Sequence, residues 1–178
     1  MTLRTWTIDP AHSNFQFIAR HMVVAKVIGR FDRFKGTLEL DPERPETGSI
    51  DVSVETASVN TNAADRDNHL RSPDFLSVEE FPAMTFQSTG IVVNSPTHLT
   101  VNGNLTLRGI TKPVVLDARR LGLLTDPWGQ SRILFHVRTT LNRIDFDIRW
   151  NKALDNGGWL VSERVEIELD VQATSPKS

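Results

Sequence analysis

Three of the five histidines, His12, His21 and His69, lie among hydroxyl and charged side chains, where they could act as acid–base groups or metal ligands. Three histidines can form a zinc site when they converge in the folded chain. No two of these three share a close His-x-His spacing, which would indicate such a site locally. Structural hydrogen bonds are the alternative, and we favour them, so we predict no metal site.

Asp9, His12 and Ser13 include the three residue types of a hydrolytic triad. A triad is defined by geometry rather than by closeness in sequence, and Ser13 does not lie in the Gly-flanked turn of a nucleophile elbow. The sequence has no cysteine, which excludes disulfides, thiolate metal sites and a cysteine nucleophile. We therefore predict no catalytic residue, and a small enzyme dependent on a metal or a histidine remains the alternative.

Charged residues gather in two further places. The segment Asp65-Arg66-Asp67 with His69 could be a charged functional cluster, but a capped, salt-bridged helix that covers one end of the molecule explains it better. Arg143 and Asp145 are two residues apart and could form a local ion pair. Contact between Arg143 and a ligand head group is the other possibility.

The elements that position these residues are almost all strands. Apolar and polar residues alternate with period two, and Gly- or Pro-containing polar turns separate the alternating segments. One helix is predicted over 62–71, with Asn62 as its N-cap and an end before Pro73. The predicted strands span 3–9, 13–20, 23–30, 34–41, 48–55, 84–93, 99–107, 113–122, 133–141 and 165–171.

Alternation of this kind gives each strand one apolar face, which must be covered. A single short helix cannot cover it, so the sheet must cover itself as a sandwich or a closed barrel. About eight strands can close into a barrel that is filled by side chains or holds a small ligand. We predict an all-β, antiparallel barrel of about eight strands with one short helix, formed by a single domain over residues 1–178.

Composition excludes several partners. The net charge is −2 and the sequence pI is about 6.2, with no block of basic residues, so a nucleic-acid partner is not expected. No segment approaches the ~20 apolar residues of a membrane-spanning helix. The first residues lack the apolar core of a signal peptide, and together with the absence of cysteine this favours the cytoplasm.

Several motifs stand together in one order, and as a set they resemble the YceI-like family of bacterial lipid-binding proteins. The resemblance runs from Trp6 to about Ala173. Asp147 stands where the family usually has Gly, Trp6 stands at the aromatic opening position, and the chain has no tyrosine. The motifs are Trp6–Ser13, Arg20-His21 with Val27–Gly36, Asp65–Phe75 with Glu80-Phe81-Pro82 and Thr85-Phe86, Gly103–Pro113, and Asn142–Phe146.

The resemblance implies a lipocalin-like barrel that carries a long isoprenoid chain, such as a polyprenyl lipid or an isoprenoid quinone, often as a homodimer. It implies no enzyme activity and no cofactor other than the bound lipid. A packed barrel that acts only through its outer surface is a further alternative. Alternation and the resemblance together predict a lipid-binding tunnel lined by Phe15, Phe17, Phe31, Phe34, Ile50, Val52, Met84, Phe86, Leu105, Leu116, Phe135 and Val137.

Overall fold

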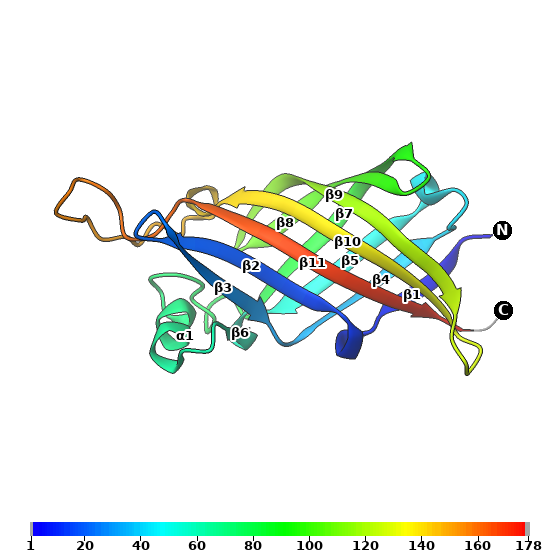
Figure 1. Cartoon of the computed structure of the whole chain (residues 1–178), viewed down its shortest axis with the longest axis horizontal. Helices are drawn as coiled ribbons and strands as arrows, with labels where there is room; N and C mark the ends of the chain where they lie inside the picture. Colours follow the sequence, from blue (N-terminus) through cyan, green and yellow to red (C-terminus); the bar gives the residue numbers. More distant parts are fainter. Residues whose placement is uncertain (1, 177–178) are drawn as a thin grey trace.

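The computed structural model describes residues 2–176 and consists mostly of antiparallel strands (Figure 1). All ten predicted strands are present, and a two-residue strand, β6, was not predicted. Four short 3₁₀ helices lie in the connections within this range: η1 (Pro10–His12), η2 (Pro45–Thr47), η3 (Thr56–Ser58) and η4 (Arg143–Phe146). The strands are β1 (Arg4–Ile8), β2 (Asn14–His21), β3 (Ala25–Phe31), β4 (Phe34–Leu40), β5 (Ser49–Glu55), β6 (Val59–Asn60), β7 (Ala83–Ser95), β8 (His98–Leu107), β9 (Ile110–Thr125), β10 (Ser131–Asn142) and β11 (Arg164–Ser175).

Eight of these strands form a closed ring in the order β1-β4-β5-β7-β8-β9-β10-β11. The ring closes because β11 pairs with β1 as well as with β10. The closing ladder is short, with Thr7 opposite Thr174 and Ile8 opposite Ala173. The prediction of a lipocalin-like antiparallel barrel of about eight strands with one short helix is therefore confirmed.

Strands β2, β3 and β6 extend the sheet outside the ring. Residues 166–170 of β11 pair with β2, whereas the later part of β11 pairs with β1. One side of β11 is thus shared between two strands, while β10 follows its other side along the whole length. The β2–β3 hairpin lies beside β11 and reaches towards the end of the barrel that carries α1 (Figure 1).

The apolar faces of the ring strands meet in the interior. Along β8, Leu99, Val101, Leu105 and Leu107 are buried, as the alternation predicts. Trp6 is fully buried, and its indole N–H donates a hydrogen bond to the Leu40 carbonyl oxygen at 3.1 Å. Removal of this apolar surface from water is the main force that holds the barrel closed.

The helix α1 (Ala64–Arg71) forms where the sequence predicts it, but its predicted cap is wrong. Asn62 adopts a left-handed conformation with φ of 61°, and Ala63 occupies the N-cap position without a side-chain hydrogen bond. The buried carboxylate of Asp67 instead accepts hydrogen bonds from the backbone N–H and the hydroxyl of Thr61, at 2.8 and 2.6 Å. Asp67 thereby connects the helix to the segment that precedes it, and in this way it fixes the start of the helix as a side-chain N-cap would.

Candidate functional site

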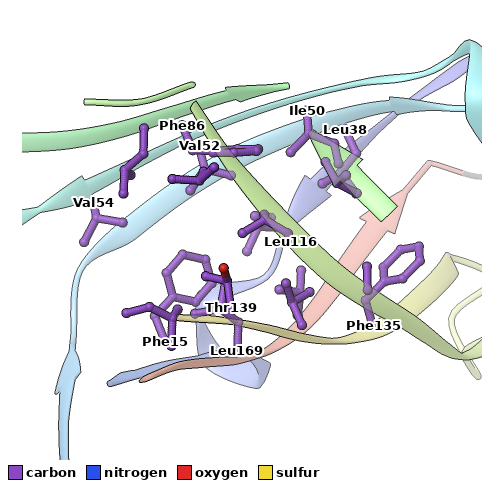
Figure 2. Close-up of a pocket in the computed structure, with 18 of the residues that line it drawn as sticks. Phe15, Leu38, Ile50, Val52, Val54, Phe86, Leu116, Phe135, Thr139 and Leu169 are labelled. Atoms are coloured by element: carbon purple, nitrogen blue, oxygen red, sulfur yellow. The ribbon is translucent and has the colours of Figure 1, made fainter. Parts of the chain in front are cut away.

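The interior of the ring contains a cavity of about 160 Å³ with an almost wholly apolar wall (Figure 2). Thr85 and Thr139 are the polar members of this wall, and none of the lining residues is ionisable. A small apolar cavity of this kind stays dry and accepts apolar ligands. The lining residues are Ile8, Phe15, Leu38, Leu40, Ile50, Val52, Val54, Met84, Thr85, Phe86, Ile91, Leu99, Val101, Leu105, Val114, Leu116, Ala118, Phe135, Val137, Thr139, Leu141, Ile167, Leu169 and Val171.

Strand register explains why these side chains converge. In β9 the residues that point inward are Val114, Leu116 and Ala118, two apart as the pleat requires. Ala118 lies opposite Leu99 of β8 and Val137 of β10, so three neighbouring strands contribute side chains at the same level. A small residue at this level leaves space that larger side chains would fill.

Most of the predicted tunnel residues do line this cavity. The nine that do are Phe15, Ile50, Val52, Met84, Phe86, Leu105, Leu116, Phe135 and Val137. The same alternation could have identified the others, such as Val101, Leu141 and Leu169.

Phe17, Phe31 and Phe34 lie outside the cavity wall. The ring of Phe34 stacks on the ring of Phe15, with centroids 3.9 Å apart and planes at 5°. Phe17 turns towards β3, where its ring occupies the space a Cβ on Gly29 would need, and it lies 5.7 Å from Phe31. Phe17 and Phe31 thus lie on β2 and β3, outside the ring, whereas Phe34 begins the ring strand β4 and packs on Phe15.

One end of the barrel is covered by a cluster of rings. His69 of α1 packs edge-on against Phe75 at 4.9 Å and against Trp150 at 4.6 Å between centroids. Its Nε2 also makes a hydrogen bond to an Asp74 carboxylate oxygen at 2.8 Å. His69 is therefore held by ring packing and by its contact with Asp74. The salt bridges expected within residues 65–69 are not found among residues 2–176, because Arg66 donates to Thr61 instead.

Arg143 holds the same end of the barrel. Its buried guanidinium donates to the carbonyl oxygens of Ile148, Trp150, Val161 and Ser162, at distances from 2.7 to 3.3 Å. Burial lowers the pKa of Arg143 below its ordinary value. The possible ion pair with Asp145 is not among its contacts in residues 2–176. The guanidinium instead links the loop segment at Ile148 and Trp150 to the segment at Val161 and Ser162.

At the other end of the barrel a second pocket, which we call the mouth pocket, has a volume of about 450 Å³. Leu40, Leu99 and Phe135 line both this pocket and the interior cavity. Figure 2 shows Phe135 at one end of the cavity lining. The rest of the mouth pocket wall is Pro42, Glu43, Pro45, Val93, Asn94, Ser95, Pro96, Arg120 and Ile133, so an apolar floor meets a more polar rim.

The residues that could have formed a triad do not assemble one. The His12 Nδ1 contacts an Asp9 carboxylate oxygen at 2.8 Å, but the Ser13 hydroxyl bonds to the backbone of Gln172, as donor at 3.2 Å and as acceptor at 3.0 Å. The Ser13 hydroxyl thus links the residue before β2 to β11 and does not bond to His12. Within residues 2–176, no group of three or more His, Cys, Asp or Glu side chains is placed to hold a metal ion.

Asp9 belongs instead to a charge network on the outside of the barrel. Arg132 lies between Asp9 at 3.0 Å and Asp126 at 2.9 Å. Burial opposes ionisation of both acids, but hydrogen bonds from His12 and Arg132 to Asp9, and from the Gln130 backbone and Arg132 to Asp126, lower the pKa of each carboxyl below 3.8. The network therefore stabilises the fold and offers no proton near the cavity.

No helix within residues 2–176 is long and apolar enough to cross a lipid bilayer.

Comparison with known proteins agrees with this architecture. The model of the YceI-like domain matches residues 6–173. A UPF0312 protein of Shewanella baltica is 39% identical over 164 residues, which cover 92% of this chain and 83% of that protein. The crystal structure of BcnA from Burkholderia cenocepacia has a TM-score of 0.82 at 19% identity and covers 93% of this chain and 98% of that one.

A polyisoprenoid-binding domain from Saccharophagus degradans, implicated in plant cell wall breakdown, also has this fold. Its TM-score is 0.69 at 15% identity, and the alignment covers 98% of this chain and 100% of that one. At such identities the two structures establish the shared fold alone. The family model and the Shewanella relative extend over most of the sequence, and the chain belongs to the YceI-like family.

Proposed function

We propose that this protein binds and carries a long apolar lipid, of the polyisoprenoid or isoprenoid-quinone class, inside its barrel. The apolar interior cavity carries the proposal, because its wall has two threonine hydroxyls and no ionisable group. Such a wall attracts hydrocarbon through the hydrophobic effect and provides nothing for acid–base chemistry. Binding is noncovalent, and the protein acts as a carrier rather than an enzyme.

The interior cavity alone is small for this ligand. Its volume of about 160 Å³ is below the ~300–1,000 Å³ of ordinary ligand pockets. The adjoining mouth pocket adds space, and movement of Phe135 would join the two, because this side chain lines both. Met84 is flexible and can also adapt its shape to a chain. A long lipid would therefore extend from the interior into the mouth pocket.

Hydrocarbon burial provides ample affinity. Each buried CH₂ contributes about 0.8 kcal/mol, while the ordering of a flexible chain opposes binding. Selectivity would follow the length and width of the cavity more than polar recognition. The polyisoprenoid class is supported by the shared fold of the Saccharophagus domain, whose name states such a ligand.

Native mass spectrometry of the purified protein, followed by solvent extraction and mass analysis of the released molecules, tests the proposal. We expect an isoprenoid-sized apolar molecule in near-stoichiometric amount, or uptake of one added as a purified polyprenyl lipid. A protein that is free of lipid and also takes up no added polyprenyl lipid would overturn the proposal and favour a barrel that acts through its surface.

A further inference from the structure

Arg120 occupies an unusual place, because it continues the inward series of β9. Val114, Leu116 and Ala118 point into the cavity, and Arg120 is the next residue in this period-two series. It lies directly opposite Phe135, where a register irregularity interrupts the β9–β10 ladder. Bulges of this type re-aim side chains at the rims of barrels. Here the result is a guanidinium at the rim of an apolar cavity.

The contacts of Arg120 leave its charge uncompensated. It donates hydrogen bonds to the carbonyl oxygens of Pro42, at 2.8 Å, and Pro96, at 3.0 Å. Both partners are neutral, and among residues 2–176 no carboxylate lies within ion-pair distance of this guanidinium. Two bonds leave three of the five guanidinium N–H groups for other acceptors. A half-buried cation with spare donors is suited to an oxyanion.

The backbone around Arg120 holds it in this position. Its own N–H donates to the Thr97 carbonyl oxygen at 2.8 Å, in the turn between β7 and β8. Pro96 belongs to the same turn, and Pro42 belongs to the connection between β4 and β5. Both connections lie at the barrel end opposite α1 (Figure 1). The guanidinium therefore spans the mouth pocket between two loops and is oriented before any ligand binds.

We propose that the mouth pocket is a head-group site, in which Arg120 binds the carboxylate or phosphate of an amphiphile whose hydrocarbon tail fills the barrel interior. This inference rests on the proposed function and specifies the ligand class further. Leu40, Leu99 and Phe135 form the boundary between head and tail, because they line both pockets. Glu43 also lines the rim, so the charge of Arg120 must outweigh a nearby acid.

Three ligands with one hydrocarbon chain test this proposal: geranylgeraniol, geranylgeranic acid and geranylgeranyl phosphate. Tryptophan fluorescence or calorimetry would measure their affinities for the wild-type protein and for Arg120→Gln. We expect at least one of the two anions to bind the wild type about ten-fold more tightly than the alcohol, which corresponds to about 1.4 kcal/mol. Arg120→Gln should abolish that preference with little change for the alcohol, and Arg120→Lys should keep part of it.

Arg119→Gln is the matched control, because Arg119 is adjacent on β9 but exposed on the outer face. It should keep the preference for the anion. Tighter binding of the acid, of the phosphate or of both by the wild type shows whether the site accepts a carboxylate, a phosphate or either group. Equal affinity of the wild type for all three ligands, or an equal loss for all three in Arg120→Gln, would overturn the head-group site while lipid binding stands. Failure of all three ligands to bind the wild type would instead contradict the proposed function itself.

Discussion

The ring of Phe86 lies over Gly103 on the neighbouring strand, so closely that a Cβ at residue 103 would be 2.3 Å from the ring Cζ. The same Cβ would lie 2.6 Å from the Gln87 carbonyl oxygen. The ring could turn away, but the backbone oxygen could not move without disturbing the β7–β8 ladder. Glycine at position 103 is thus required by close packing rather than by an unusual backbone angle.

Gly103→Ala is therefore expected to destabilise the fold by about 1–3 kcal/mol, as overpacking of a core does. The midpoint of urea unfolding measures this loss. Gly90→Ala is the matched control, since a Cβ at Gly90 meets no atom within 4 Å, and it should change stability by no more than about 0.5 kcal/mol. Equal changes in the free energy of unfolding for the two substitutions would show that the strand moves away from the Gln87 carbonyl oxygen with little loss of stability.

Ala118→Phe is expected to fill the interior cavity. Ala118 is 4% exposed and lines the cavity beside Leu99 and Val137, so a larger side chain enters the space that the proposed lipid tail would occupy. Uptake of a polyprenyl lipid should fall at least about ten-fold, with a stability change within the ~1–3 kcal/mol of overpacking.

The control for this substitution is Val115→Phe, three residues earlier on the same strand. Val115 is 57% exposed on the outer face, so its enlargement should leave lipid uptake unchanged. Full uptake by a folded Ala118→Phe protein would contradict the assignment of the interior as the tail site.

Acid should weaken the fold through Asp9 and Asp126, whose pKa values are lowered in the folded chain. A carboxyl with a lower pKa in the folded state adds stability above its unfolded pKa, near 3.9, and this stability is lost as pH falls through the folded value. Unfolding midpoints should therefore change little between pH 7 and pH 5 from this source and fall below pH 4. Arg132→Gln removes the shared cation and should reduce this acid dependence.

Arg138→Gln serves as the comparison for Arg132→Gln. The Arg138 side chain is 67% exposed and its guanidinium lies 3.4 Å from the Glu168 carboxylate, and exposed pairs of this kind contribute little to stability. Urea unfolding at pH 7 and pH 3 measures both variants. An acid dependence in Arg132→Gln as steep as in the wild type would show that other carboxyls cause the loss.

Arg143→Leu should destabilise the covered end of the barrel strongly. The substitution leaves four carbonyl oxygens of the 148–162 segment without their donor, and a buried polar group without a partner costs about 1–3 kcal/mol. A total loss above about 3 kcal/mol is expected, with faster hydrogen exchange in that segment. Arg149→Gln breaks an exposed pair with Asp147 and should cost less than about 1 kcal/mol. Similar losses in the two variants would contradict the structural role of Arg143.

The strands could be predicted from sequence because alternation is a local signal. The Ile50-Val52-Val54 series of β5 is an example, since each of its members reaches the cavity. β6 has two residues and is too short to show any period. At Asp147 the resemblance implies Gly, and the left-handed backbone there, with φ of 58°, is a conformation that favours Gly.

The errors at the site have one physical cause, which is that alternation identifies a face but not what lies opposite it. Phe17 and Phe31 belong to apolar faces of strands that leave the ring, where their rings pack on each other, and Phe34 at the start of β4 packs on Phe15 instead of lining the cavity. Arg120 was missed for the converse reason. Alternation alone places Arg119 and Arg120 on opposite faces of a strand, but only the pairing of Arg120 with Phe135 shows that Arg120 lies in the wall of the mouth pocket.

The short ladder between β1 and β11 has a consequence for the order of events during synthesis. Its pairs join residues 7 and 8 to residues 174 and 173, so the contact that completes the ring spans nearly the whole chain. Loops of this length close late and slowly. While the ribosome is still adding β11, the inward faces of seven ring strands form an open sheet with an exposed apolar surface. A ligand that needs an enclosed interior can therefore enter only after β11 has been synthesised and has paired with β1, and the open sheet is exposed to aggregation until then.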